Sequence, residues 1–287
     1  MRMYRGILAA LSMAALGAII ATPAKAQTWV QVPGTLSQIS VGDSTTILGV
    51  NSADDVSQYN NAGGWTKLPG LLTQVAVGTD GAVWGINSSG QTYQYQSSTG
   101  TWTNIPGTLT SIYVGGKDLV WGLNASGYIY RFDPATKEWE QVVGAASQLS
   151  VASDGTVIGL SQGQLFFFEP VLQQFVGVAG VNGAGPLSQI VAGFGAAVFA
   201  IDTSGNVYQF DVLSQQLISI PGNLSQIAVG SISSIYGVNS AQVAYQFSTT
   251  TGTWTKLPGA ALTKIAVSPD GTVWGLSSTG QVYYLQP

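Results

Sequence analysis

Cysteine and histidine are both missing from this 287-residue chain, and charged residues make up only 8% of it. Without cysteine there is no disulfide and no thiolate nucleophile, so stability must come from packing and hydrogen bonds. Without histidine, a Ser-His-Asp triad, a Cys-His pair and the usual zinc ligand sets cannot be built. These absences favour binding over catalysis, and we expect no enzyme activity, no cofactor and no metal.

The scarcity of positive charge narrows the range of partners. Lys and Arg total 9 against 13 Asp and Glu, and three of the bases fall within the first 26 residues. The remainder of the chain carries 9 − 3 = 6 bases and 13 acids, a formal charge of −7. Nucleic acids and anionic membranes are bound by clustered Lys and Arg. We therefore expect neither as a partner.

The first 26 residues have the pattern of a signal peptide. Two arginines precede an uncharged, mostly apolar run from Gly6 to Ala21, and Ala24-Lys25-Ala26 follows it. This pattern predicts cleavage after Ala26 and secretion of residues 27–287, either to a periplasm or to the medium. A membrane anchor is the alternative, but the apolar run is shorter than the roughly 20 residues of a spanning helix. No later segment is long and apolar enough to span a membrane.

A repeat of about 37 residues runs through the rest of the chain. Its clearest segment is the hexapeptide Trp-Thr-x-Leu/Ile-Pro-Gly. In the seven units, the first position of this segment is held by Trp29, Trp65, Trp102, Trp139, Phe175, Leu217 and Trp254. The intervals between these residues range from 65 − 29 = 36 to 217 − 175 = 42. The longest interval contains an insertion around Val181 to Gly185. Internal repeats of this length are typical of propellers and solenoids.

Each unit contains four short runs that predict β-strands. In the second unit, the Trp65 segment is followed by Leu72 to Gly78, by Val83 to Asn87 and by Tyr93 to Tyr95. The runs are β-branched or aromatic and are separated by turns such as Asp80-Gly81, where glycine accepts a positive φ. Four strands in about 37 residues is the pattern of a propeller blade. A solenoid fits less well, because it needs shorter coils and atypical end caps.

The sequence therefore predicts an all-β fold, a seven-bladed β-propeller of four-stranded antiparallel blades, in one domain from residue 27 to residue 287. The last unit ends at Pro287 without a Trp strand, and the chain's first strand, Thr28 to Val32, has no blade before it. We expect this N-terminal strand to close the ring beside Tyr283 to Leu285, because closure removes both free strand edges.

The repeat resembles the tectonin repeat and the tachylectin group of propeller lectins. The resemblance covers Trp29 to Pro287 and is strongest in the units that keep a Trp-Gly-Ile/Leu segment, at Trp84, Trp121 and Trp274. It implies a non-catalytic, glycan-binding or innate-recognition protein. Its expected partners are glycans or cell-surface polysaccharide, lipopolysaccharide among them. A structural or protein-interaction propeller is the alternative, because fold alone does not decide function.

The candidate carbohydrate site combines aromatic faces with neutral hydrogen-bonding groups. The candidates come from the Trp-Gly-Ile/Leu segments and the turns that follow them. They are Trp84, Asn87, Trp121, Asn124 and Trp274, with Asn51 and Asn239 at the equivalent turns of other units. Sugar C–H groups pack on indole faces while hydroxyls meet amides. The alternative for each tryptophan is core packing between blades. We expect these turns to share one face of the ring with the Pro-Gly turns.

Carboxylates supply two further hypotheses. Asp43, Asp80, Asp118, Asp154 and Asp270 stand at the same turn in five units. These aspartates could bind Ca²⁺ around one mouth of the channel, or they could simply form hydrogen bonds within their own turns. The absence of Ca²⁺-loop spacing favours the second interpretation. Glu138, Glu140 and Glu169 are candidates for a glycosidase pair. Nothing in the sequence places two of these acids in one pocket.

Overall fold

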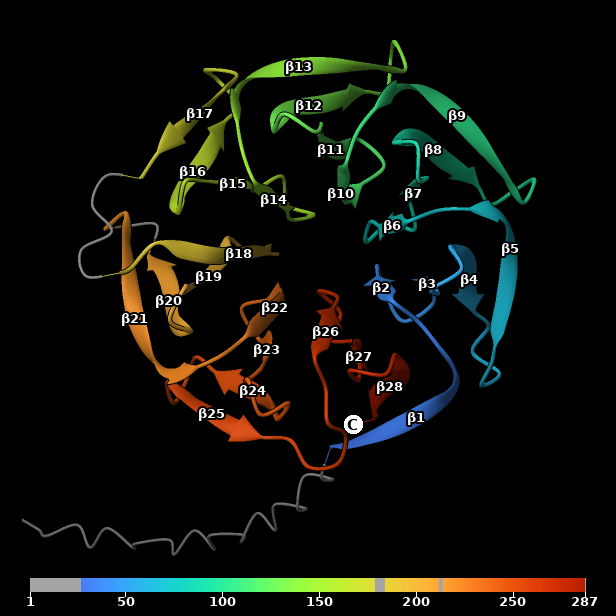
Figure 1. Cartoon of the computed structure of the whole chain (residues 1–287). Helices are drawn as coiled ribbons and strands as arrows, with labels where there is room; N and C mark the ends of the chain where they lie inside the picture. Colours follow the sequence, from blue (N-terminus) through green and yellow to red (C-terminus); the bar gives the residue numbers. More distant parts are fainter. Residues whose placement is uncertain (1–26, 179–183, 212–213, 287) are drawn as a thin grey trace, which may run out of the picture.

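The structure is a computed structural model that describes residues 27–178, 184–211 and 214–286. The expected signal peptide, residues 1–26, and most of the insertion around Val181 to Gly185 lie outside the described residues. Within these ranges the regular secondary structure is entirely β, with 28 strands and no helix. The strands form seven four-stranded antiparallel sheets around a central channel (Figure 1), which confirms the seven-bladed propeller.

The strands of each blade are given below in order from the innermost to the outermost. Blades 1 to 3 contain β2 (Gln38–Val41), β3 (Ile47–Val50), β4 (Asp55–Tyr59), β5 (Trp65–Leu71); β6 (Gln74–Val77), β7 (Val83–Ile86), β8 (Gln91–Gln96), β9 (Thr101–Thr108); and β10 (Ser111–Gly116), β11 (Leu119–Leu123), β12 (Tyr128–Asp133), β13 (Glu138–Ala145). Blades 4 to 6 contain β14 (Gln148–Val151), β15 (Val157–Ser161), β16 (Gln164–Glu169), β17 (Gln174–Gly177); β18 (Leu187–Gly193), β19 (Ala197–Asp202), β20 (Asn206–Asp211), β21 (Gln216–Asn223); and β22 (Gln226–Ser231), β23 (Ser234–Val238), β24 (Ala244–Ser248), β25 (Thr253–Lys256). Blade 7 contains β26 (Lys264–Val267), β27 (Val273–Leu276), β28 (Gln281–Gln286) and, as its outermost strand, β1 (Thr28–Thr35).

The ring is closed by the N-terminal strand, as the sequence predicts. Strand β1 pairs antiparallel with β28, with Trp29 opposite Leu285 and Val32 opposite Val282. Blade 7 is thus built from both ends of the described chain (Figure 1). Pairing β28 with β1 leaves neither terminal strand without a neighbour, which matters in a propeller that has no disulfide.

The hydrophobic core lies between neighbouring blades. One cluster joins Trp84 and Ile86 of blade 2 to Ile112, Val120 and Phe132 of blade 3. Similar clusters lie between other neighbouring blades. Strands such as β3 and β7 therefore have a blade on each side, and all of their residues are buried. The apolar runs of the repeat are therefore interface residues of the ring.

The Trp and Pro-Gly parts of the repeat meet across neighbouring blades. The indole Nε1 of Trp102 donates a hydrogen bond to the carbonyl oxygen of Pro69 in the preceding blade, at 2.8 Å. A Cβ atom added to Gly107 would lie 2.6 Å from Cδ1 of Trp139, and Gly107 has a φ of 148°. Glycine is required there by both the backbone conformation and the approaching indole.

Glutamine side chains bond neighbouring blades near the channel. In each case the amide nitrogen donates to a backbone carbonyl of the next innermost strand, while the amide oxygen accepts the N–H of the same residue. These glutamine clamps are Gln38 on Val75, Gln74 on Ile112, Gln148 on Ile190, Gln189 on Ile227 and Gln226 on Ile265. At the seam between blades 7 and 1, Lys264 takes the glutamine position, and its Nζ donates to the Ser37 carbonyl at 2.9 Å.

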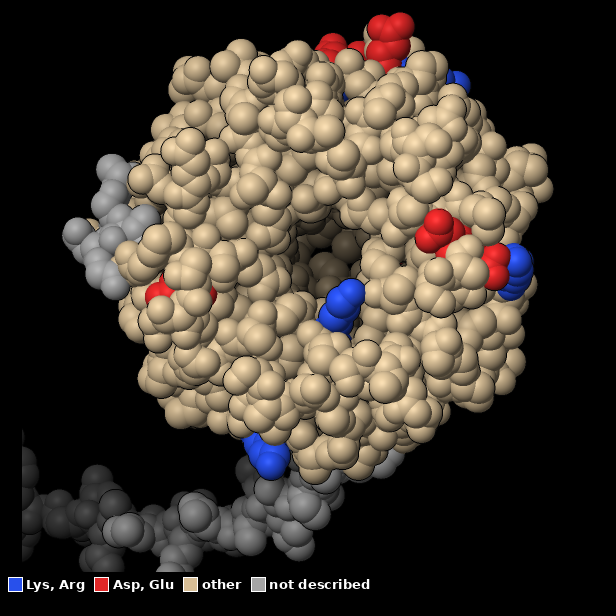
Figure 2. Space-filling view, in the orientation of Figure 1, with Lys and Arg blue, Asp and Glu red and all other residues tan. Residues whose placement is uncertain are grey.

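Alternating strand direction gives the ring two different faces. The aspartate face carries the hairpins between first and second strands, with Asp43, Asp80, Asp118, Asp154 and Asp270, and the hairpins between third and fourth strands. The asparagine face carries the turns between second and third strands and the Pro-Gly linkers. The linker residue Leu109 donates its N–H to the carbonyl of Gly90 in such a turn, at 2.9 Å. Figure 2 shows the asparagine face, where charged side chains are sparse around the open channel.

Candidate functional site

The predicted asparagines lie on the asparagine face and hold their own turns. The Oδ1 atom of Asn87 accepts hydrogen bonds from the backbone N–H groups of Ser89 and Gln91, at 3.1 and 2.9 Å. Its Nδ2 donates to Gln91 Oε1 at 2.8 Å and to Tyr93 Oη at 3.4 Å. Corresponding turn bonds to Oδ1 recur at Asn51, Asn124 and Asn239. These amides are therefore committed to turn structure before any ligand arrives.

The predicted tryptophans lie in the core between blades. Trp84, Trp121 and Trp274 are 0%, 2% and 3% exposed. The ring of Trp84, for example, meets Phe132 edge to face, with centroids 4.6 Å apart. Each tryptophan lies near the start of its strand, next to an aspartate-face hairpin. Asn87 and Asn124 follow the opposite ends of the strands that contain Trp84 and Trp121. Three residues of strand span about 10 Å, so the structure does not bring each Trp–Asn pair into one surface site.

Clefts between blades open toward the aspartate face. The 7/1 cleft, of about 410 Å³, is lined by Trp274 and Tyr284 of blade 7 and by Tyr59, Asn61 and Ser44 of blade 1. Tyr59 meets Trp274 edge to face with ring centroids 4.7 Å apart. Two aromatic walls next to amide and hydroxyl groups are the combination that a sugar ring needs.

The 3/4 cleft has the same arrangement with more charged side chains in its lining, whereas Asp270 is the charged residue that lines the 7/1 cleft. It has a volume of about 450 Å³ and is lined by Trp121 and Arg131 of blade 3 and by Phe168 and Gln173 of blade 4, among others. The guanidinium of Arg131 donates to Glu140 at 3.0 Å and to Gln173 at 2.9 Å. The arginine is thus held in a fixed position at the cleft wall, with its charge balanced by Glu140.

One repeat position lines these clefts, and sequence reasoning missed it. The middle residue of the third strand is Tyr284 in the 7/1 cleft, Arg131 in the 3/4 cleft and Phe167 in a 4/5 cleft of about 440 Å³. The equivalent residues elsewhere are Gln58, Gln94, Gln209 and Gln246. The sequence signal was present: these three units depart from glutamine at a position of the third strand that lines a cleft.

Three of the five hairpin aspartates, Asp80, Asp154 and Asp270, accept hydrogen bonds from backbone amides of a neighbouring blade. Asp154 accepts from Gly195 N at 2.7 Å and Ala196 N at 3.1 Å in the next blade. Equivalent bonds run from Lys117 N to Asp80, at 2.8 Å, and from Ser44 N to Asp270, at 2.9 Å. Within the described residues, no three Asp, Glu, His or Cys side chains gather closely enough to hold a metal ion. The geometry agrees with the interpretation of these aspartates as turn residues.

These contacts also set the ionisation of the carboxyls. Burial raises the pKa of Asp154, but the hydrogen bonds from Thr156, Ala196 and Gly195 together lower it by more than burial raises it. The pKa therefore lies below its ordinary value. The same balance, with burial opposed by bonds from Ser268, Thr272 and Ser44, lowers the pKa of Asp270. Both side chains are therefore charged acceptors near neutral pH.

The glutamates do not form a carboxylate pair. Glu138 is exposed and lies opposite Asp133 in the β12–β13 ladder. Glu140 is bonded to Arg131. Glu169 lines the 4/5 cleft, a blade further on. The structure therefore offers no pair of facing acids at these three positions.

Fold and clefts together define a seven-bladed β-propeller with recurring hollows between its blades. The model of the tectonin domain matches residues 19–136, 55–218 and 212–287. The chain therefore belongs to the tectonin family. A search of curated proteins finds no significant match.

Solved structures show the same fold at low sequence identity. YCF48 bound to a D1 peptide is 16% identical, with a TM-score of 0.69 over 93% of this chain and 97% of that one. Virginiamycin B lyase from Staphylococcus aureus is 14% identical, with a TM-score of 0.71 over 91% and 99%. A chain of the mitotic checkpoint complex is 12% identical, with a TM-score of 0.73 over 99% of both chains. At these identities the likeness extends to the fold alone.

Proposed function

We propose that this protein is a secreted, non-catalytic, lectin-like propeller that binds glycans or cell-surface polysaccharide in the clefts between its blades. The observation that carries the proposal is the recurrence of one cleft geometry on the aspartate face, each time with an aromatic wall. The 7/1 cleft is the best candidate, because Tyr284, Tyr59 and the edge of Trp274 stand beside Asn61 and Ser44.

The chemistry of the clefts suits carbohydrate. Aromatic faces take up the apolar C–H side of a sugar ring, and neutral side chains exchange hydrogen bonds with its hydroxyls. Tryptophans Trp121 and Trp274 remain part of the proposal, as cleft walls. The asparagine turns, by contrast, are bonded internally, so we place the sugar on the aspartate face and assign Asn51, Asn87, Asn124 and Asn239 to turn support.

Repetition adds strength without new contacts. Several weak clefts on one face of a rigid ring engage neighbouring sugars of a polysaccharide together, so the overall affinity exceeds that of one cleft. The clefts differ in the middle residue of the third strand, which predicts unequal preference. A surface rich in repeated sugars, lipopolysaccharide among them, fits this arrangement better than a single free sugar.

Secretion and the lack of catalysis are part of the same proposal. The pattern of residues 1–26 supports export with cleavage after Ala26. Across the described residues, no helix is long and apolar enough to cross a membrane. The carboxylates that line the 3/4 cleft include Glu140, which is bonded to Arg131, and this supports binding rather than hydrolysis.

A protein-interaction propeller is the second candidate, and one surface favours it. The β16–β17 hairpin of blade 4 exposes Val171 and Leu172, at 91% and 59%. Exposed apolar side chains of this kind mark protein interfaces. The similar propeller YCF48 is itself seen with a bound peptide.

A glycan array with the chain from residue 27 onward separates the two candidates. The lectin proposal expects saturable binding to at least one polysaccharide, with a weaker response to its monosaccharide. Recovery of one stoichiometric protein from the native extract, unaffected by competing glycans, together with an empty array, would replace it by the interaction propeller.

A further inference from the structure

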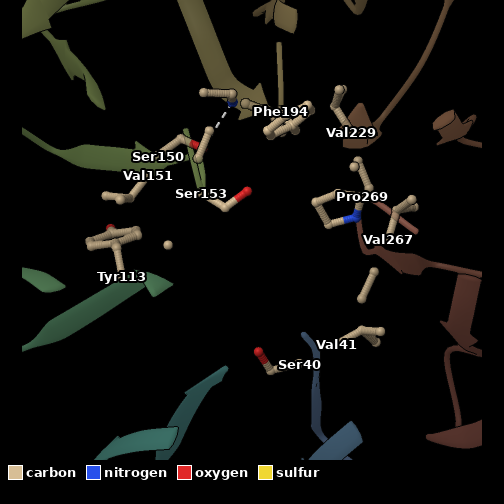
Figure 3. Close-up of a pocket in the computed structure, with 18 of the residues that line it drawn as sticks. Ser40, Val41, Tyr113, Ser150, Val151, Ser153, Phe194, Val229, Val267 and Pro269 are labelled. Carbon is tan, nitrogen blue, oxygen red and sulfur yellow. Dashed lines mark hydrogen bonds between the residues drawn. The ribbon is translucent and has the colours of Figure 1, made fainter. Parts of the chain in front are cut away.

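The central channel contains a cavity that the glycan proposal leaves unused. It has a volume of about 410 Å³ and is lined by the innermost strands and by the hairpins of the aspartate face (Figure 3). This volume lies within the range of small-molecule sites, roughly 300–1,000 Å³. None of its lining residues is charged, because the lining consists of aliphatic, hydroxyl, amide, glycine, proline and aromatic residues. An ionic ligand would lose its hydration there without a counter-charge.

The repeat provides an internal standard for this cavity. In the seven innermost strands, the residue two places after the glutamine position is Ser40, Ala76, Tyr113, Ser150, Val191, Ala228 or Ala266. Three residues further along the chain, the corresponding residues are Asp43, Thr79, Gly116, Ser153, Phe194, Ser231 and Pro269. One aromatic residue stands in each set, Tyr113 in the first and Phe194 in the second. Both line the same cavity (Figure 3).

Phe194 is not explained by packing. The residue is 51% exposed at the channel mouth, and its tie to the next blade uses backbone atoms only: Phe194 N donates to Gly230 O of blade 6 at 2.9 Å. Burial raises the pKa of the Tyr113 hydroxyl. Tyr113 therefore stays uncharged at neutral pH and presents an aromatic wall to the cavity.

Two serine hydroxyls of the cavity are positioned by the backbone of a neighbouring blade. Ser40 Oγ accepts the N–H of Val77 at 3.0 Å, and Ser150 Oγ accepts the N–H of Ala192 at 2.9 Å. Each hydroxyl uses one of its two acceptor positions in this bond and keeps its own proton for donation. The amides of Gln148 and Gln189 are occupied by the clamps on the next blade. A ligand therefore meets hydroxyl donors between apolar walls.

We propose that the channel is a second binding site, for a compact, uncharged aromatic molecule that carries a carbonyl or ether oxygen as a hydrogen-bond acceptor. Its ring lies against Phe194 at the mouth, and its acceptor oxygen receives a hydrogen bond from Ser40 or Ser150. The site is separate from the clefts, and it stands whether or not the protein binds glycans.

The uncharged fluorophore prodan, a flat naphthalene with a ketone, tests this proposal directly. Titration should give a saturable blue shift of its emission with one site per chain. Phe194→Ala should weaken binding about three- to ten-fold, the range for one aromatic contact. Ser153→Trp, which fills the mouth of the cavity, should abolish it. Ile232→Ala is the matched control, because Ile232 is 43% exposed on the next hairpin and does not line the cavity.

Three results bear on the proposal. Binding that follows the expected order of variants, and that a saturating glycan does not displace, supports a separate channel site. The absence of a saturable shift overturns it. Equal binding by wild type and Ser153→Trp overturns it too, because prodan would then lie elsewhere.

Discussion

At the scale of single residues, the ring is joined by side chains that bond to the backbone of a neighbouring blade. The Gln74 amide satisfies both the N–H and the carbonyl of Ile112, at 3.0 Å each. Removing it leaves two partly buried polar groups without that partner. Unsatisfied groups of this kind cost about 1–3 kcal/mol.

Gln74→Ala should therefore lower the free energy of unfolding by about 1–3 kcal/mol, measured by urea denaturation. Gln31→Ala, on the exposed side of the outer strand β1, is the control and should change it by less than about 0.5 kcal/mol. Equal effects of the two substitutions would show that the clamp adds no stability.

Gly107 isolates the contact between Pro-Gly and tryptophan. Gly107→Ala places a Cβ 2.6 Å from Trp139 Cδ1 at a φ of 148°. Gly144→Ala is matched, since Gly144 has a φ of 126° but its added Cβ meets only Ile129 Cδ1, at 3.6 Å. The Gly107 variant should lose about 1–3 kcal/mol more than the Gly144 variant in thermal unfolding, because the indole must shift. Equal losses would mean that backbone conformation alone requires glycine.

At the scale of elements, the aspartate hairpins make the stability of the ring depend on pH. The pKa values of Asp154 and Asp270 lie below the ordinary value, which in an unfolded chain is about 3.9. Their contribution is complete above that pH and is lost as the pH falls through the lower folded-state pKa. The melting temperature should therefore decline below about pH 4.

The double variant Asp154→Asn, Asp270→Asn should melt lower than wild type at pH 7 and show a shallower decline below pH 4. Asp118→Asn serves as control, because this side chain is 62% exposed and its ion pair with Lys117 is 4.0 Å long. A double variant that keeps the full acid sensitivity of wild type would assign that sensitivity to other groups.

Strand β1 is the element whose loss should matter most. Deleting residues 27–34 removes the partner of β28 and opens the ring at blade 7. Compared with the chain that begins at residue 27, the shortened chain should unfold at a much lower temperature and self-associate in size-exclusion chromatography, because an unpaired edge is exposed. Coincident melting curves would contradict closure by this strand.

The sequence predicted these elements well because each is encoded locally. Runs of β-branched and aromatic residues between glycine turns gave the four strands of each unit, and the missing outer strand of the last unit gave the closure. The proposed binding site could not be obtained the same way. Trp84 and Asn87 are three residues apart, yet a strand places them near opposite faces. Clefts arise only when blades pack, so Tyr59 and Tyr284 meet from distant parts of the chain.

At the scale of the whole molecule, the two faces of the ring differ in structure. The asparagine face is occupied by turns and linkers that bond to one another. The aspartate face opens into clefts whose third-strand residue varies from blade to blade. A ring whose clefts differ from blade to blade on one face suits recognition by that face, and this is the central claim of the proposed function.

The most direct measurement is a calorimetric titration of the best oligosaccharide from the array against four proteins. They are wild type, Thr272→Trp and Pro134→Trp, which fill the 7/1 and 3/4 clefts, and the double variant Asn87→Ala, Asn124→Ala on the opposite face. Filling a cleft should remove bound equivalents or lower affinity at least ten-fold, whereas the asparagine variant should bind as wild type does. Unchanged binding by both cleft-filled proteins, or loss of binding in the asparagine variant alone at unchanged stability, would contradict it.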